Sequence, residues 1–497
     1  MVLVALALAL ALALPDTSQA ISLNEIKKLA ASDAAAFNSF GGSIAVSGDT
    51  VVIGAFGSGA FDELSGGAAY VVQRNEGGAL NWGEVKKLTA SDTEVYDAFG
   101  SSVAISGDTI VVGAHKEDTE GNQAGAAYVF ERDEGGADNW GEVKKLTASD
   151  AQSEDWFGRS VAVSGDTALV GAELEDSGGT NAGAVYVFQR DEGGAGTWGE
   201  TKKFIASDAQ AGDQFGVSVA FSGETVVVGA FVEDAGGADA GAAYVFQRNE
   251  GGVDNWGEVK KLTASDAQNG DLFGVSVAVG GDTAIVGAMF EDAGGSDAGA
   301  AYVFQRDEGG VDNWGEVEKV IASDAQADDA FGGSVALSGD SALVGAPSDA
   351  GAAYVFQRDE GGTDNWGEVD KLIASDAQAD DAFGRSVALN GDIAFVGANW
   401  EDAGGTNAGA AYVFDLLLPK PTPTVTLTPT ITPTPRATLP PGVGGISLDS
   451  DLRALPVETP QSSSSPSLGM LASGVAVGAV AAALASAAWR ARRRSPV

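Results

Sequence analysis

The chain of 497 residues contains no cysteine and only one histidine, His115. Without cysteine there can be no disulfide, no thiolate metal site and no cysteine nucleophile. A single histidine excludes a metal site built from several imidazoles and a Ser–His catalytic pair repeated along the chain. His115 stands in a polar segment, where the simplest interpretation is a solvated side chain without a functional role.

Positive charge is also scarce. Between residues 21 and 418 there are 21 basic and 66 acidic residues, a net charge of −45. A field of this sign repels phosphate backbones and anionic lipid, so we expect no nucleic-acid partner. It favours basic or neutral partners, and it also keeps a repetitive β protein soluble.

A Phe-Gly pair occurs seven times and is followed about a dozen residues later by Gly-Ala. A regular period of about 58 residues indicates one supersecondary unit copied in tandem, and that length holds four strands with their turns. The sequence therefore predicts an all-β fold, a seven-bladed β-propeller of four-stranded blades. The pairs begin at Phe40, Phe99, Phe157, Phe215, Phe273, Phe331 and Phe383.

The third unit shows how the residues of one blade are distributed. Small residues in the first strand suit the crowded axis, while Tyr186 and Phe188 in the third strand fill the wedge between blades. The paired lysines Lys202 and Lys203 lie on the outermost strand, where lysine discourages edge-to-edge pairing. Alternation and turn residues predict the four strands at 160–164, 168–172, 183–190 and 199–206.

The last unit ends at its third strand, residues 409–414, with no fourth strand behind it. The missing strand is found at the other end of the chain. Residues 23–29 read LNEIKKL and match the fourth-strand sequence WGEVKKL at 140–146. We therefore predict that the N-terminal strand completes the last blade and closes the ring.

Both ends of the chain differ in composition from the repeats. The apolar run 2–14 and the small residues before Ala20 are typical of a signal peptide over residues 1–20, which leaves the propeller at 21–418. A Pro/Thr/Ser-rich stalk is predicted at 419–467. An uncharged stretch at 468–489 predicts a transmembrane helix, and the arginine-rich residues 490–497 a basic cytoplasmic tail.

A tail that is apolar and then basic also resembles bacterial C-terminal sorting signals that are removed after export. The sequence does not separate a retained helix from a cleaved one. Both alternatives predict a propeller exported to the cell surface, and the first makes the chain a single-pass membrane protein.

The repeated sequence FG-x-S-V-A-x-S-G-D-T-x-x-V-G-A resembles the FG-GAP repeat of integrin α-subunit propellers and of many bacterial surface proteins. The resemblance implies a seven-bladed propeller with a role in extracellular binding or adhesion. Calcium in that family is often held by an Asp-x-Asp-x-Asp-Gly loop, but the turn here is Ser-Gly-Asp-Thr, as at 106–109. One carboxylate cannot supply six to eight oxygens, so we expect no cofactor and, at most, weak calcium binding on acidic loops.

In a four-stranded meander, the loops from the fourth strand to the next first strand share one face with the loops from the second strand to the third. The resemblance implies ligand contacts on this face. The acidic side chains there indicate either a cation-assisted or basic-partner binding surface, or residues that cap turns and bond loop amides, and the near-identity of the loops favours the second interpretation. The candidate residues are Glu233, Asp234, Asp266, Asp271, Glu291 and Asp292, with equivalents such as Asp208 and Asp213.

The sixth unit breaks the sevenfold pattern. It has only 52 residues and lacks the acidic loop, so that residues 347–350 leave a notch in an otherwise even rim. A neutral deletion is the alternative interpretation. Ser348 and Asp349 are the candidate ligand-binding residues of this notch.

One tryptophan recurs near the start of the fourth strand in six units, which suggests either carbohydrate stacking or, more simply, packing. No catalytic constellation is visible, because every acidic position is repeated. We therefore expect a non-enzymatic recognition or adhesion module with an extracellular protein or glycan ligand. A passive structural envelope protein is the alternative, and a carbohydrate-active enzyme ranks third. The tryptophans are Trp82, Trp140, Trp198, Trp256, Trp314 and Trp366.

Overall fold

The structure is a computed structural model, which describes residues 25–57, 66–252, 255–360 and 362–417. The predicted signal peptide (1–20), stalk (419–467), transmembrane helix (468–489) and basic tail (490–497) lie outside the described residues. Within the described ranges, no helix has the length and apolar character needed to cross a membrane.

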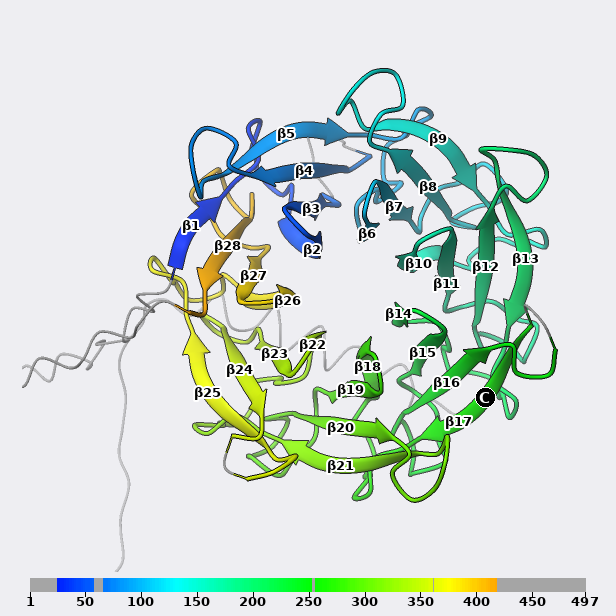
Figure 1. Ribbon diagram of the computed structural model, residues 1–497, viewed down its shortest axis with the longest axis vertical. Coiled ribbons are helices and arrows are strands. Elements are labelled where there is room, and N and C mark those ends of the chain that lie inside the picture. Colours follow the sequence, from blue (N-terminus) through cyan, green and yellow to red (C-terminus); the bar gives the residue numbers. More distant parts are fainter. Residues whose placement is uncertain (1–24, 58–65, 253–254, 361, 418–497) are drawn as a thin grey trace, which may run out of the picture. The chain divides into compact units, whose positions relative to one another are not determined.

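The described residues form seven antiparallel four-stranded sheets, arranged as the blades of a ring (Figure 1). The all-β seven-bladed propeller predicted from the repeat is therefore confirmed. Blades one to three comprise β2 (Phe40–Ser47), β3 (Thr50–Ala55), β4 (Ala68–Arg74) and β5 (Trp82–Leu88); β6 (Ser102–Ser106), β7 (Thr109–Ala114), β8 (Ala126–Glu131) and β9 (Gly141–Leu146); and β10 (Phe157–Ser164), β11 (Thr167–Ala172), β12 (Ala184–Arg190) and β13 (Trp198–Phe204).

The remaining four blades repeat this order, with the first strand innermost and the fourth outermost (Figure 1). Their strands are β14 (Val219–Ser222), β15 (Thr225–Ala230), β16 (Ala242–Arg248) and β17 (Trp256–Leu262); β18 (Phe273–Gly280), β19 (Thr283–Ala288), β20 (Ala300–Arg306) and β21 (Trp314–Val320); β22 (Ser334–Ser338), β23 (Ser341–Ala346), β24 (Ala352–Arg358) and β25 (Trp366–Leu372); and β26 (Phe383–Asn390), β27 (Ile393–Ala398), β28 (Ala410–Asp415) and β1 (Glu25–Leu29).

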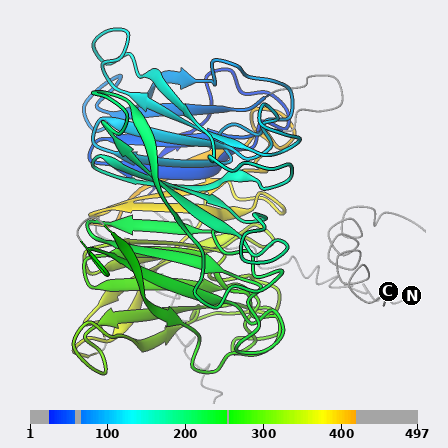
Figure 2. The same cartoon turned by 90° about the vertical axis from the view of Figure 1, so that its right-hand side faces the viewer.

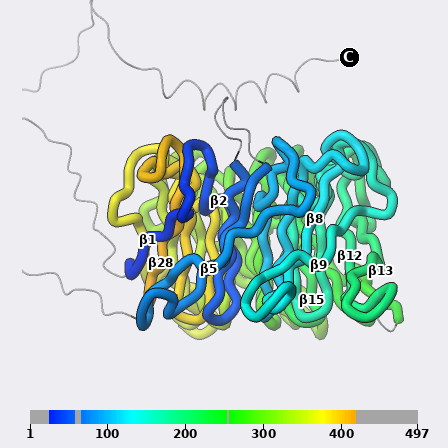
Figure 3. Tube along the Cα trace, turned by 90° about the horizontal axis from the view of Figure 1, so that it is seen from above, coloured from blue at the N-terminus to red at the C-terminus, as the bar shows by residue number. Residues whose placement is uncertain are grey.

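The N-terminal strand β1 completes the seventh blade, as its sequence predicts. It pairs antiparallel with β28, with Lys28 opposite Tyr412, and the two strands lie side by side at the edge of the ring (Figure 3). Glu25 also accepts hydrogen bonds from the backbone N–H and the hydroxyl of Ser375, at 2.8 and 3.0 Å. The two ends of the propeller sequence are thus joined within one sheet.

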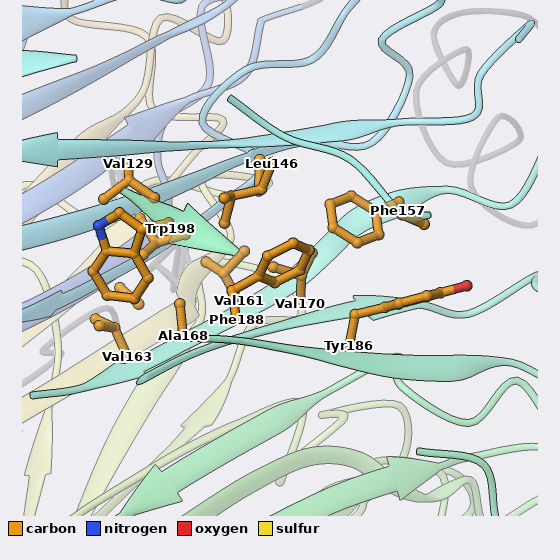
Figure 4. Close-up of a cluster of buried hydrophobic side chains, with 14 of the residues drawn as sticks. Val129, Leu146, Phe157, Val161, Val163, Ala168, Val170, Tyr186, Phe188 and Trp198 are labelled. Atoms are coloured by element: carbon orange, nitrogen blue, oxygen red, sulfur yellow. The ribbon is translucent and has the colours of Figure 1, made fainter. Parts of the chain in front are cut away.

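The hydrophobic core lies between neighbouring blades. Val129 and Leu146 of blade two pack against Phe157, Tyr186 and Trp198 of blade three, in a cluster whose members are almost fully buried (Figure 4). Equivalent clusters recur around the ring. Each blade therefore depends on its neighbour for its core, which is why one unit cannot bury its hydrophobic faces alone.

The Phe-Gly, Ser and Gly-Ala residues of the repeat hold the blades together near the axis. Gly41 has a φ of +87°, and a Cβ on it would collide with the Ala410 carbonyl oxygen, so only glycine fits. Two residues further on, Ser43 donates a hydrogen bond of 2.9 Å to the Gly100 carbonyl of the next blade. The equivalent bond from Ser386 to Gly41, at 2.7 Å, closes the circle.

Candidate functional site

The loops that follow the second and fourth strands meet on one face of the ring, which we call the loop face. The backbone N–H of Gly212, in the loop between β13 and β14, donates to the Thr180 carbonyl at 2.9 Å, in the loop between β11 and β12. Gln214 N–H donates to the Asn181 carbonyl in the same way. Figure 2 shows the ring from the side, with its connections gathered on two opposite faces.

A lysine network is repeated on this face. Lys261 lies 2.8 Å from Asp208 and 2.8 Å from Glu233, and its ammonium group stands 5.4 Å from the Tyr244 ring centroid. The Tyr244 hydroxyl donates to the second oxygen of Asp208 at 2.8 Å. This lysine of the outermost strand therefore binds the loops. Its expected effect on edge-to-edge pairing of the strand is a separate one.

The network determines which of its groups are charged. Burial would raise the pKa of Asp208, but hydrogen bonds from Lys261 and Tyr244 outweigh it and hold the pKa below its usual range. Burial would lower the pKa of Lys261, but its bonds to both carboxylates leave that pKa raised. Burial and the bond to Asp208 raise the pKa of Tyr244. Lysine and aspartate are thus fixed as ions and tyrosine as the neutral donor.

Two of the predicted site residues, Glu233 and Glu291, are buried members of this network. Only 1% of each residue is exposed. Glu291 lies 2.7 Å from Lys319 and accepts a bond from the Ala293 N–H, and Glu233 bonds Lys261 and the Ala235 N–H in the same way. These carboxylates already have protein partners.

Three of the remaining acidic candidates also have contacts within the fold. Asp234 and Asp292 are exposed, and each accepts a hydrogen bond from a backbone N–H five residues later, at 2.8 and 2.9 Å. Asp266 binds Tyr302 and Lys319 as Asp208 binds its own partners. The turn-capping interpretation accounts for these contacts, and ligand binding by these side chains stays a prediction.

Asp271 differs because its carboxyl group is buried without a cation beside it. It is 3% exposed and accepts a bond of 2.7 Å from the Gln268 N–H. Burial, together with the negative charges of Glu291, Asp292 and Asp266, raises its pKa to about 6. Asp97 and Asp155 occupy the equivalent positions in other blades, and the pKa of each is also raised to about 6.

Blade six has a cleft of about 380 Å³ at the predicted notch. Its lysine, Lys371, keeps its bond to Asp324 at 2.7 Å, but no described glutamate takes the second place. The side chain of Lys371 is 39% exposed, against 20% for Lys319 of the preceding blade. The shortened loop has therefore removed a carboxylate and opened the space that it would fill. The cleft is lined by Asp324, Gln326, Asp329, Ser348, Asp349 and Lys371, among others.

A second set of positions breaks the sevenfold pattern close to the axis. In blades two and three, the residue after Phe-Gly contacts the residue after Gly-Ala, Ser101 with His115 and Arg159 with Glu173. In four blades, the ladder between the first two strands is interrupted beside the residue after Phe-Gly. Bulges of this kind re-aim side chains. We call these pairs the axial collar: Gly42 with Phe56, Ser101 with His115, Arg159 with Glu173, Val217 with Phe231, Val275 with Met289, Gly333 with Pro347, and Arg385 with Asn399.

His115 is part of this collar, so the expectation of a solvated loop histidine is wrong. The residue is 9% exposed, its Nδ1 lies 2.9 Å from the Ser101 hydroxyl, and its ring centroid is 5.5 Å from that of Trp156. Burial and the nearby charges of Arg159 and Lys116 lower its pKa to about 3. The imidazole is therefore neutral at physiological pH.

The turns between the first and second strands use their single carboxylate for an internal ion pair. Asp166 lies 2.9 Å from the Arg190 side chain, and Asp108 pairs with Arg132. Among the described residues, no group of three or more acidic, histidine or cysteine side chains is placed to hold a metal ion.

The recurring tryptophans are packing residues. All six are between 1% and 3% exposed, and Trp82 contacts the Phe395 ring edge-on at a centroid distance of 5.0 Å. Such buried indoles present no face on which a sugar could stack. The packing interpretation of this series is confirmed.

The notch was predicted from the sequence, but the collar was not. When the units are aligned by their Phe-Gly and Gly-Ala pairs, the residues that follow these two pairs form a different combination in each of the seven copies. The variation was therefore visible in the sequence. Its significance depends on the fold, which brings the two positions into contact, as in Ser101 with His115 and Arg159 with Glu173.

Comparisons with known proteins agree with the repeat. The family model of the FG-GAP repeat matches seven segments of the chain. No curated protein matches it by sequence. A chain of the crystal structure of the mitotic checkpoint complex superimposes with a TM-score of 0.47 at 11% identity, over 84% of this chain and 98% of that one. The segments matched by the family model are 23–72, 82–130, 140–188, 198–246, 256–304, 314–356 and 366–414.

Proposed function

The chain belongs to the FG-GAP repeat family, and on that premise we propose that it is a non-enzymatic recognition or adhesion module whose ligand docks on the loop face at the blade-six cleft. An FG-GAP propeller fold is consistent with a ligand-binding or adhesion-type module. The finer assignment, to an extracellular protein or glycan ligand at a cell surface, is part of the proposal.

The cleft is the single observation that supports this choice of site. On the rim of the loop face, the recurring glutamates and aspartates of blades three to five are engaged in lysine pairs or turn caps. Blade six instead leaves Lys371 and Asp329 accessible around a space of about 380 Å³. An exposed ammonium group and exposed carboxylates around one cleft can bond the donors and acceptors of a protein loop or a glycan.

A loop graft tests the site. Replacing Ser348–Ala350 with a copy of Phe290–Ala298 restores the loop length and the missing glutamate, keeps Pro347, and should fill the cleft. The probes are arrayed extracellular matrix proteins and glycans, offered to the full chain with and without calcium. We expect binding of any captured probe to weaken at least tenfold in the graft.

The matched control puts the same nine residues in place of Val232–Ala240, where the native loop already has that length. Binding should survive this exchange. A ligand whose affinity is unchanged by the blade-six graft does not use the cleft, and a chain that captures no probe speaks against the recognition function itself.

Surface display is a separate part of the proposal, supported by the sequences of the two ends rather than by the structure. Protease added to intact cells should release a fragment of propeller size. A protected propeller, or one that fractionates with the cytosol, would contradict this topology.

A further inference from the structure

The axial collar contains two arginines in a domain that is otherwise strongly acidic. Arg159 bonds Glu173 through Nε at 3.3 Å. Arg385 makes no ion pair or side-chain hydrogen bond with any described residue, because its collar partner is Asn399 where Arg159 has a glutamate. The strands that contain these arginines, β10 and β26, lie on opposite sides of the central opening in Figure 1.

The two guanidinium groups are close enough to influence each other. Arg385 is accessible to water, yet protein atoms surround it, and this enclosure lowers its pKa; the charge of Arg159 lowers it further. His115, the titratable collar residue of blade two, stays neutral and supplies no compensating charge. Two like charges that act on each other are stabilised by an anion between them.

Two buried acceptor atoms lie in the same collar. Asn399 is 3% exposed and Glu173 is 4% exposed. The Asn399 Oδ1 and the Glu173 Oε2 have no hydrogen-bond partner among the described residues. Because burying an unbonded polar atom is costly, these atoms are free to accept a hydrogen bond from a ligand with an N–H or O–H donor.

The collar is apolar on the side formed by blades four and five. Val217, Phe231, Val275 and Met289 occupy the four collar positions there, and each is half-buried. A ligand that reaches both halves of the collar therefore combines a carboxylate, a nearby N–H and an apolar group. A doubly charged phosphate fits less well, since the net charge of −45 opposes each added negative charge.

We propose that the axial collar binds the carboxylate of an acylated amino acid with an apolar side chain, either as a free N-acylamino acid or as the C-terminus of a protein. Arg385 and Arg159 bind the carboxylate, Asn399 accepts from the amide N–H, and the side chain packs against blades four and five. The inference rests on the proposed ligand-binding function but places this ligand at the axis instead of the blade-six cleft.

The single histidine provides a site-specific probe. His115 lies beside Arg159, so its imidazole resonances report on the collar without assignment of the rest of the spectrum. Titrating the full chain at pH 6.5 with N-acetyl-leucine should shift these resonances saturably. N-acetyl-leucinamide, which has no carboxylate, should leave them unchanged.

Two variants assign the binding to the collar. Arg385→Gln should weaken the binding of N-acetyl-leucine at least tenfold. The control Arg74→Gln removes an arginine that is paired with Asp49 in the turn after β2, and it should leave the affinity unchanged. Equal affinity of the wild type and Arg385→Gln for the acid, or equal shifts by the acid and its amide, would overturn the proposal.

Further probes separate the sources of the ligand and the two proposals. Glucuronate, a carboxylate without an apolar side chain, should bind at least tenfold more weakly than N-acetyl-leucine, and equal binding would overturn the choice of an apolar acid. If a leucine-terminated pentapeptide binds more tightly than N-acetyl-leucine, the natural ligand is a protein C-terminus. If the pentapeptide binds more weakly, the natural ligand is a free N-acylamino acid. The blade-six graft should leave all of these titrations unchanged.

Discussion

The rim of the loop face and the axial collar follow opposite rules. On the rim, the same lysine, aspartate, glutamate and tyrosine recur from blade to blade with nearly the same distances: the lysine–glutamate pairs span 2.7–2.9 Å. In the collar, no two blades carry the same pair of residues. The residues that recur in the blades are those that each blade needs in order to fold. The residues that vary beside the axis are not required by the fold.

The largest effect on the repeated part should come from removing its closing strand. Deleting residues 21–33 strips β28 of its partner and removes the bonds of Glu25 and Lys28 to blade seven and its loops. We expect the melting temperature to fall by roughly 10 °C or more, because an edge and part of a core are exposed. Scanning calorimetry measures this, with a deletion of residues 1–20 as the control. An unchanged melting curve would refute the closure.

A smaller loss should follow from breaking one rim network. Glu233→Gln leaves Lys261 without its buried counter-ion and should cost about 1–3 kcal/mol of unfolding free energy in urea. The neighbouring substitution Asp234→Asn, at an exposed turn cap, should cost clearly less. If both cost the same, the network is not the stabilising feature of the rim.

The pH dependence of stability should distinguish the buried aspartates of the rim from the aspartates that are paired with lysine. The raised pKa of about 6 at Asp97, Asp155 and Asp271 means that their contribution to stability is complete below about pH 4 and is lost as the pH rises through 6. The lowered pKa of Asp208 has the opposite effect, since its contribution is present above about pH 4 and disappears in stronger acid.

The melting temperature should therefore rise by a few degrees as the pH is lowered from 8 to 5. Changing Asp97, Asp155 and Asp271 together to Asn should flatten this rise, which differential scanning fluorimetry across the pH range would measure. A triple variant with the same slope as the wild type would show that general charge repulsion is responsible instead.

The smallest effect should be found in the collar. Arg385→Gln removes a charge that has no described partner, so the unfolding free energy should change by no more than about 0.5 kcal/mol, or increase slightly. Urea unfolding beside Glu233→Gln makes the comparison direct. A loss as large as that of the rim variant would assign Arg385 a structural role.

The sequence predicted those features that depend on repetition. Strand order, blade number and the closure by residues 23–29 follow from the spacing of Phe-Gly and from one unmatched strand, and the structure has all three. Gly41 and Ser43 show why, since sterics and one inter-blade bond impose the same residues in every copy.

The environment of His115 could not be predicted in this way. Its burial depends on Trp156, a residue of the next blade that comes about forty positions later in the chain. The pKa of Asp271 likewise depends on three carboxylates brought near it by two different loops. Contacts between blades decide both, and no local pattern contains them.

The position of β28 has a mechanical consequence. Although β28 is the last strand of the ring in the chain, it lies inside its sheet, between β27 and β1. A pull on Leu417 along the direction of the strand would act on two hydrogen-bond ladders at once and in shear, because those bonds run perpendicular to the strand. An edge strand would instead be peeled away one bond at a time, so the chain leaves the propeller at a point suited to resist tension.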